Sequence, residues 1–171
     1  MDLFKEWVWA GWLKKWVLSR RDSLEMVQSI EGSLGVKLGL PRSAQASCQE
    51  PEEGVVFVHF DGMVFVKTGA TFFPFLGSPE SLALFPSVTV DEGAIRFLLN
   101  GADVMRPGIR SFDDWGAAGK DVVVKEEKKG RAIAVGVASV GSEEARSLTK
   151  GSVLKNVHHV ADKYWNLYKK G

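Results

Sequence analysis

Residues 89–109 constrain the fold more than any other part of the chain, because they combine a capped helix, a glycine stop, a short strand and a turn. Asp91 suits the N-cap, where a side-chain oxygen accepts a hydrogen bond from the first helical turn. Gly101 stands where a left-handed C-cap is expected. Val104-Met105 predicts a short strand before the Pro107-Gly108 turn. The helix is predicted to have two faces. The buried face carries Ala94, Ile95, Leu98 and Leu99, and the exposed face carries Gly93, Arg96 and Asn100.

The first half of the chain predicts a helix followed by a β-hairpin. Ser19 or Asp22 can cap a helix over about residues 23–33, with a buried stripe at helical spacing. That stripe is formed by Leu24, Val27, Ile30 and Leu34. Residues 39–54 have the composition of a loop, with two prolines and an acidic cluster. Residues 55–67 predict a hairpin with an Asp-Gly turn. Its arms are almost continuously apolar, which predicts burial on both faces.

Aromatic residues gather on either side of this helix and hairpin. Residues 1–17 hold four of the six tryptophans, and a helix on a membrane surface is one interpretation of them. Packing against the same domain is the interpretation we favour. His59, inside an apolar arm, is expected to be a hydrogen-bonded interior histidine. Residues 71–76 form an aromatic cluster around a proline, and a short helix at 79–84 leads to a boundary at Phe85-Pro86.

The second half predicts a small β-barrel, so the chain is expected to be an α+β protein with domains at 1–85 and 86–171. Several short strands separated by turns at close spacing are typical of small barrels. Gly136 inside a strand predicts a bulge or a close backbone approach. The predicted elements are strands at 122–124, 131–138, 153–160 and 164–168, and a helix capped by Ser142.

Composition sets broad limits on the function. The net charge is +1, with 8 basic and 10 acidic side chains in residues 1–85 and 14 and 11 in residues 86–171. This mild asymmetry predicts a few local phosphate contacts and no histone-like basic surface. No apolar run approaches the roughly 18 residues that span a bilayer. A single cysteine, Cys48, cannot form an internal disulfide, which favours a reducing cytoplasm.

The sequence lacks the common catalytic and metal-binding motifs. It has no GxxxxGK[ST], no HExxH and no CxxC, and three histidines with one cysteine do not make a standard zinc site. Asp113 and Asp114 are neighbours in a glycine-rich loop, where solvated carboxylates are the simpler interpretation. Cys48 has no basic neighbour in the sequence that would activate it. We therefore expect a binding protein without enzymatic activity, and no metal or cofactor.

Three blocks in the second half resemble a PUA domain, a family of small RNA-binding pseudo-barrels. They are GADVMRPGI at 101–109, RAIAVGVA at 131–138 and KGSVLKNVHHVADKYW at 150–165. The chain is also similar to the translation-reinitiation factors first associated with T-cell malignancy, to their yeast counterpart and to the ligatin-like initiation factor. In that group a pre-PUA domain precedes the PUA domain. The resemblance implies a pre-PUA α/β domain followed by a PUA pseudo-β-barrel.

The resemblance also implies an RNA-binding protein of the translation apparatus. Its expected ligand is structured RNA, either small-subunit rRNA or the acceptor end of a tRNA. Expected partners are the small ribosomal subunit or an initiation-factor-like protein, with no membrane, and we expect a cytoplasmic monomer. One alternative is an accessory RNA-binding subunit for tRNA or rRNA modification or ribosome biogenesis. Another is a scaffold that docks partner proteins through an exposed aromatic surface around Phe72, Phe73 and Phe75.

The resemblance implies RNA contacts from the first helix of the second domain, the glycine loop, the Pro-Gly strand and the last strands. Glycines let a phosphate or ribose approach the backbone, and arginines beside them add charge. We expect a flat glycine surface rimmed by arginine, suited to shape readout of an RNA helix end. The predicted RNA-binding residues are Arg96, Asn100, Gly101, Ala102, Arg106, Gly108, Ile109, Arg110, His158 and Lys163.

Overall fold

The computed structural model describes residues 6–7 and 14–170. Within them the chain forms two compact units, one up to Leu84 together with the residues from Asn166 onward, the other from Phe85 to Trp165. The residues after Trp165, which the sequence analysis assigned to the second domain, thus belong to the first unit by their contacts. Most of the tryptophan-rich start lies outside the described residues. Trp7 and Trp16 are described, and both lie in strands.

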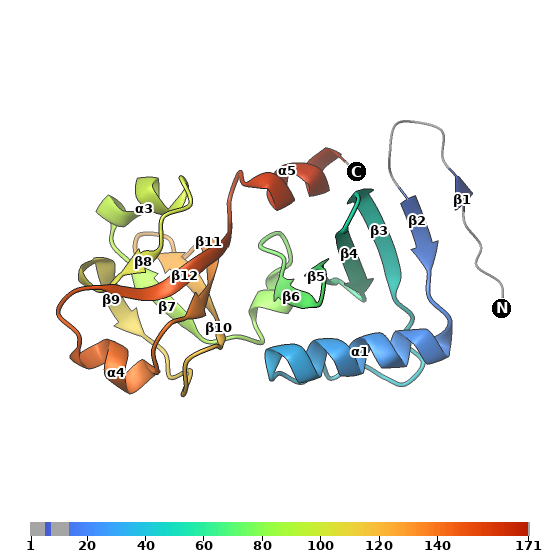
Figure 1. The fold of residues 1–171 in the computed structure, drawn as a ribbon, viewed down its shortest axis with the longest axis horizontal. Coiled ribbons are helices and arrows are strands. Elements are labelled where there is room, and N and C mark those ends of the chain that lie inside the picture. The colour runs from blue at the N-terminus through green and yellow to red at the C-terminus, as the bar shows by residue number, and fades with distance from the viewer. Residues whose placement is uncertain (1–5, 8–13, 171) are drawn as a thin grey trace. The chain divides into compact units, whose positions relative to one another are not determined.

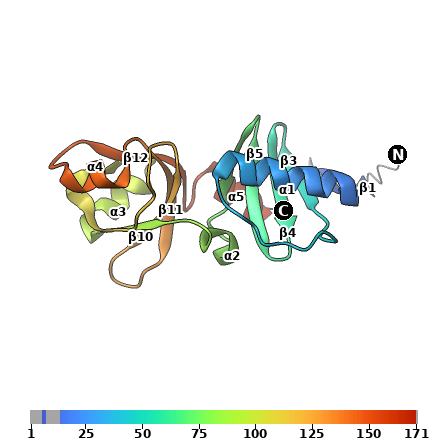
Figure 2. The ribbon, with the colours of Figure 1, turned by 90° about the horizontal axis from the view of Figure 1, so that it is seen from below.

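The first unit is an antiparallel sheet with helices (Figures 1 and 2). Its strand order among the described residues is β1-β2-β3-β4-β5-β6, so every strand pairs with its neighbour in sequence. Its elements are β1 (Glu6–Trp7), β2 (Lys14–Val17), α1 (Arg20–Leu34), β3 (Ser47–Glu52), β4 (Val55–Phe60), β5 (Met63–Thr68), β6 (Thr71–Pro74), α2 (Pro79–Leu82) and most of α5 (Lys163–Lys170).

Local signals in the sequence explain most of this unit. The Ser19 side chain accepts a hydrogen bond from the Asp22 amide and begins α1, which ends at Gly35 in the left-handed conformation. The turn between β4 and β5 has positive φ at both Asp61 and Gly62, as a primed hairpin turn requires. The predicted hairpin is therefore confirmed. Leu24 differs from its prediction, since it is 43% exposed and does not belong to the buried stripe.

Two further expectations for this unit are corrected. Residues 39–54 are only partly a loop, because Ser47–Glu52 form β3, which pairs with β2 and β4. The polar composition of this segment does not predict a strand. The strand forms because β2 and β4 supply its hydrogen bonds. His59 stacks on Tyr168 at 5.8 Å, but its Nε2 has no hydrogen-bond partner among the described residues. Burial, with a smaller effect of Lys15, lowers the pKa of His59.

The phenylalanines around the proline of the first unit lie in its core. Phe72, Phe73 and Phe75 are 6%, 4% and 2% exposed. Tyr168 of α5 packs on Phe75, with ring centroids 4.3 Å apart, and on Phe57 at 5.1 Å. The exposed aromatic surface that the scaffold interpretation needs at Phe72, Phe73 and Phe75 is therefore absent, and that form of the prediction is wrong.

Cys48 is buried in the same unit. Burial raises the pKa of its thiol to about 11, against a smaller opposing effect of Lys67. The thiol is therefore protonated at neutral pH, and an unreactive cysteine is what the sequence led us to expect.

The second unit is a curled sheet with strand order β8-β12-β11-β10-β7-β9, in which only β10 and β7 are parallel (Figure 1). The α+β class and the barrel-like second half are thus confirmed. Its elements are β7 (Ser87–Val90), α3 (Glu92–Leu98), β8 (Val104–Met105), the 3-10 turn η1 (Arg106–Gly108), β9 (Ile109–Phe112), β10 (Asp121–Glu126), β11 (Ala132–Ala138), α4 (Ser142–Ser147) and β12 (Ser152–His159).

Gly136 sits where β11 and β12 shift register, as predicted. A Cβ at this position would lie 2.8 Å from the Cβ of Leu154, so only glycine lets the two strands approach this closely. The core around this contact consists of Trp115 and aliphatic side chains from the strands and from helices α3 and α4 of the unit. Trp115 also donates a hydrogen bond to the Val140 carbonyl, which ties the loop before β10 to the loop before α4.

Two predicted local features of the second half are wrong. Residues 164–168 were expected to be a strand, but they belong to α5, because Asp162 accepts a hydrogen bond from the Trp165 amide as helix N-caps do. Gly141, and not Ser142, occupies the N-cap of α4. Ser142 is buried, and its hydroxyl donates to Asp114, which also accepts from the Gly116 amide.

Asp121 carries a buried carboxyl group. It is 8% exposed, and its Oδ2 has no hydrogen-bond partner among the described residues. Burial raises its pKa to about 7. The folded protein therefore holds a proton that the unfolded chain releases near pH 4, where a free aspartate titrates.

We expect Asp121 to make the protein less stable as pH rises from about 4 to 7, because only the unfolded state gains a solvated carboxylate over this range. The Asp121→Asn variant lacks this titration. The free energy of unfolding of Asp121→Asn minus that of the wild type should therefore increase as pH rises through that range, and become constant above about pH 7. Urea denaturation of both proteins at several pH values measures the difference, and a pH-independent difference would contradict the prediction.

Candidate nucleic-acid interface

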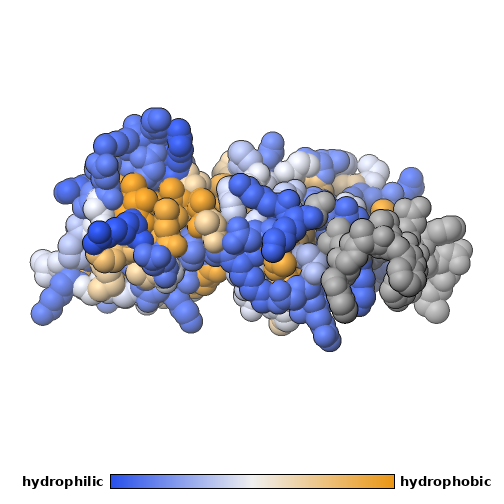
Figure 3. All heavy atoms as spheres, turned by 90° about the horizontal axis from the view of Figure 1, so that it is seen from above, coloured by the Kyte–Doolittle hydropathy of each residue, from blue (hydrophilic) through white to orange (hydrophobic). Residues whose placement is uncertain are grey.

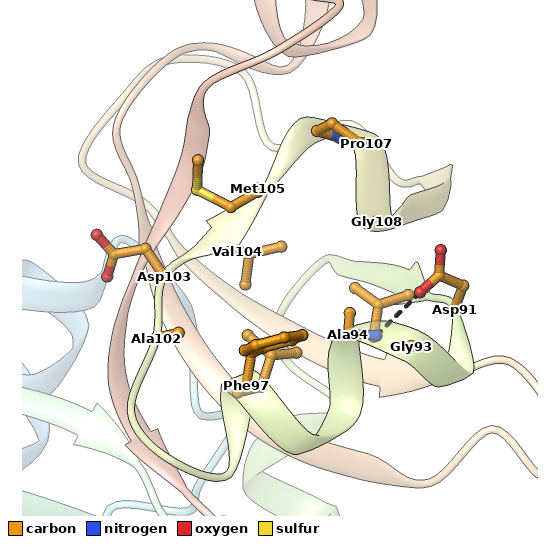
Figure 4. A pocket seen from close by; sticks show the side chains of 12 residues that line it. Asp91, Gly93, Ala94, Phe97, Ala102, Asp103, Val104, Met105, Pro107 and Gly108 are labelled. Carbon is orange, nitrogen blue, oxygen red and sulfur yellow. Dashed lines mark hydrogen bonds between the residues drawn. The ribbon is translucent and has the colours of Figure 1, made fainter.

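The predicted RNA-binding face contains a groove of about 370 Å³ (Figure 4). It lies between α3 and the segment that runs through β8 into η1. Its lining is mainly apolar and comprises Val90, Asp91, Gly93, Ala94, Phe97, Leu98, Ala102, Asp103, Val104, Met105, Pro107 and Gly108. The groove is thus built from the segment that the sequence singled out, although its hollow, apolar shape was not predicted.

Large apolar side chains are exposed at this groove. Phe97 is 54% exposed and Met105 is 49% exposed, and Leu99 is 36% exposed on the same helix end. Figure 3 shows hydrophobic residues gathered on the surface of the second unit. Phe97 was not among the predicted site residues, because it was assigned to neither face of the helix. Exposed apolar patches of this kind mark binding surfaces.

The loop after α3 is held in one conformation by β12. Gly101 has φ +88°, and the Ala102 amide donates to the Phe97 carbonyl, which closes the helix. The side-chain amide of Asn156 in β12 donates to the carbonyls of Leu98 and Ala102, both at 3.0 Å. The Asn156 backbone amide in turn donates to Asp103. Asn156 is a residue that sequence reasoning missed.

The three arginines of the predicted interface have different surroundings. Arg96 is exposed, and its guanidinium lies 5.0 Å from the Phe97 ring centroid. Arg110 is also exposed and forms an ion pair with Asp91 at 3.4 Å. Arg106 is half-buried: it lies 4.9 Å from the Phe112 ring centroid and donates to the carbonyls of Ile109 and Arg146. The expected flat glycine surface rimmed by arginine is therefore replaced by an apolar groove with Arg96 at its edge.

Two predicted contacts are corrected because their side chains are buried. His158 is 0% exposed, and its Nδ1 donates to Asp162 at 2.8 Å. Although burial raises the pKa of Asp162, the hydrogen bonds from His158 and from the Trp165 and His159 amides lower it overall. Ile109 is 4% exposed and belongs to the core of the unit. Both residues support the interface from inside and present no side chain to a ligand.

The other predicted residues keep an accessible position. Asn100, Gly101 and Ala102 are exposed in the loop after α3, Gly108 is half-buried in the groove, and Lys163 is exposed at the start of α5. Whether they contact RNA stays a prediction.

The structure offers no metal-binding cluster within residues 6–7 and 14–170, where no group of three or more His, Cys, Asp or Glu side chains could hold an ion. Asp113 and Asp114 also have structural roles. Asp113 accepts hydrogen bonds from the amide and hydroxyl of Ser87, and Asp114 accepts those from Gly116 and Ser142. These hydrogen bonds, with a smaller opposing effect of burial, lower the pKa of Asp114.

Comparison with known proteins identifies the family. Residues 86–160 match the PUA domain. The chain is 34% identical to translation machinery-associated protein 20 of Saccharomyces cerevisiae over 138 residues, which cover 74% of this chain and 75% of the yeast protein. The chain belongs to this family of PUA-domain proteins. The family includes the proteins named malignant T-cell-amplified sequence, so the resemblance seen in the sequence is confirmed.

Two archaeal proteins are further relatives of this PUA-domain protein. An uncharacterized protein of Methanocaldococcus jannaschii is 48% identical over 80 residues, 46% of this chain and 49% of that protein. This match thus spans about half the length of that relative. The crystal structure of a hypothetical protein from Pyrococcus horikoshii is 30% identical, with a TM-score of 0.73 over 90% of this chain and 98% of that one. The likeness therefore extends beyond the PUA unit.

None of the helices within the described part of the chain is long and apolar enough to cross a membrane.

We expect Arg106 to stabilise the fold beside the groove through its contacts within the protein. Arg106→Ala removes two hydrogen bonds and the contact with Phe112, and should lower the free energy of unfolding by about 1–2 kcal/mol. Arg110→Ala is the matched control, because an exposed ion pair contributes little to stability. Urea denaturation of both variants measures the effect, and equal stabilities would contradict the structural role of Arg106.

Proposed function

We propose that this PUA-domain protein binds the end of a structured RNA in the translation apparatus. The proposed ligand is the acceptor end of a tRNA or a helix end in small-subunit rRNA. The observation that carries the proposal is the glycine loop held by Asn156 beside an open apolar groove with Phe97 at its mouth. A preformed loop contributes to affinity because it loses little conformational freedom on binding.

The groove favours stacking over base reading. Exposed Phe97 and Met105 present apolar surface to the flat face of a terminal base, and aromatic stacking tolerates any base sequence. Arg96 lies close to the Phe97 ring, where it can approach a phosphate beside a stacked base. Asn100, Gly101 and Ala102 let the sugar–phosphate backbone come near the main chain. The interface therefore suits recognition of RNA shape.

The proposed role is binding without catalysis. The acidic residues that could have suggested catalysis, Asp113 and Asp114, are occupied by hydrogen bonds within the fold. The family includes the yeast protein named translation machinery-associated protein 20. This membership supports RNA binding in translation and a cytoplasmic location. The proposed partner is the small ribosomal subunit or an initiation-factor-like protein. An accessory role in tRNA or rRNA modification or in ribosome biogenesis uses the same interface and remains the alternative.

We expect salt-sensitive binding of moderate affinity to a tRNA acceptor-stem hairpin. Among the described residues no Lys or Arg side chain lines the groove, and Arg96 lies beside it at Phe97. Few phosphate contacts are therefore expected, and the logarithm of the affinity should fall with the logarithm of the salt concentration with a slope on the order of −2 to −4. Fluorescence titration at several salt concentrations measures it, with small-subunit rRNA fragments as the second ligand. Absence of binding to both RNAs at low salt would refute the proposed function.

We expect Phe97→Ala to weaken RNA binding by about 1–3 kcal/mol, the usual contribution of one base–aromatic stack. Its side chain is 54% exposed, so the melting temperature should change little. Leu24→Ala is the matched control, because Leu24 is also an exposed apolar side chain but lies on α1 of the first unit. Affinities of the wild type and both variants for the same hairpin test this. If Phe97→Ala keeps full affinity, RNA does not bind at the groove.

A further inference from the structure

His159 places an unpaired nitrogen beside the glycine loop. If Gly101 carried a Cβ, that atom would lie 3.7 Å from Nε2 of His159. None of the described residues forms a hydrogen bond to this nitrogen, whereas the other ring nitrogen is occupied. The ring thus borders the exposed loop at Gly101, which has no side chain.

The hydrogen bonds of His159 determine which nitrogen carries the proton. Its Nδ1 lies 2.9 Å from the Val160 carbonyl oxygen. A carbonyl oxygen can only accept, so Nδ1 donates and carries the hydrogen. In the neutral ring Nε2 then has a lone pair and acts as an acceptor. The backbone around the ring is fixed as well, since the His159 amide donates to Asp162 and the Asp162 amide donates to the His159 carbonyl.

We infer that Nε2 of His159 accepts a hydrogen bond from a ribose 2′-hydroxyl of the bound RNA, and so lets this protein distinguish RNA from DNA. The inference rests on the proposed function and names the chemical group that the site selects. A neutral acceptor nitrogen cannot bind a phosphate oxygen, because both atoms present lone pairs. Within an RNA chain the 2′-hydroxyl is the donor on the sugar–phosphate backbone, and DNA lacks it. Gly101 leaves room for a ribose to reach this nitrogen.

The test compares 2′-hydroxyl and 2′-fluoro RNA. The probe is a tRNA acceptor-stem hairpin in which one nucleotide at a time carries 2′-fluorine, which keeps the sugar pucker of RNA but has no hydrogen to donate. Titrations are run at about pH 8. The wild type should lose about 3- to 10-fold in affinity at one nucleotide, as expected for a single hydrogen bond.

His159→Asn is the informative variant. Its amide can still donate to the Val160 carbonyl, as Nδ1 does, but it is too short to reach the position of Nε2. The variant should bind the 2′-hydroxyl and 2′-fluoro forms of that nucleotide equally, with a wild-type melting curve. A preference that persists in this variant would overturn the inference.

The wild-type scan is decisive by itself, even if the variant does not fold. Equal affinity for every 2′-fluoro probe and for the unmodified hairpin would overturn the role of His159 and leave the proposed function intact. Absence of binding to any hairpin would overturn both.

Discussion

The side-chain amide of Asn156 holds the loop after α3 against β12, and the candidate interface depends on these two hydrogen bonds. They reach the Leu98 carbonyl at the end of α3 and the Ala102 carbonyl in the loop that follows. They add to the bonds from the Gly101 and Ala102 amides to the Leu98 and Phe97 carbonyls, and together these contacts hold the glycine loop beside the groove. The Asn156 backbone amide adds a third bond, to Asp103. A single polar residue on a sheet strand thus orders the segment that would meet a ligand.

The strand that carries Asn156 is itself irregular. The register between β11 and β12 shifts at Gly136, and the register between β12 and β8 shifts between Ser152 and Leu154. Bulges of this kind redirect side chains and are common near binding sites. Here Asn156 and His159 face the loop after α3, while His158 is buried. The same strand therefore supplies both the support and the ligand-facing nitrogen.

The apolar character of the groove changes how the interface would work. Of the three arginines predicted to contact RNA, Arg106 is half-buried and donates to main-chain carbonyls, and Arg110 is paired with Asp91. Stacking on Phe97 and contacts with the ribose would then contribute much of the affinity, and phosphate contacts would contribute less. Phe72, Phe73 and Phe75 of the first unit are buried, so the exposed Phe97 and Met105 belong to the PUA unit.

The sequence by itself determined the elements that depend on local chemistry. Asp91 capped α3, Gly101 ended it, and the Asp61-Gly62 turn set the hairpin, because caps and turns are governed by a few adjacent residues. The family resemblance identified the PUA unit and the segment that lines the groove. Tertiary structure decided the rest. Residues 164–168 became a helix and 47–52 a strand because Asp162 and the neighbouring strands supply their hydrogen bonds. Likewise, only the packed fold buries His158 and Ile109, turns Arg106 inward and places His159 against Gly101, because each side chain's direction depends on contacts with residues distant in the sequence.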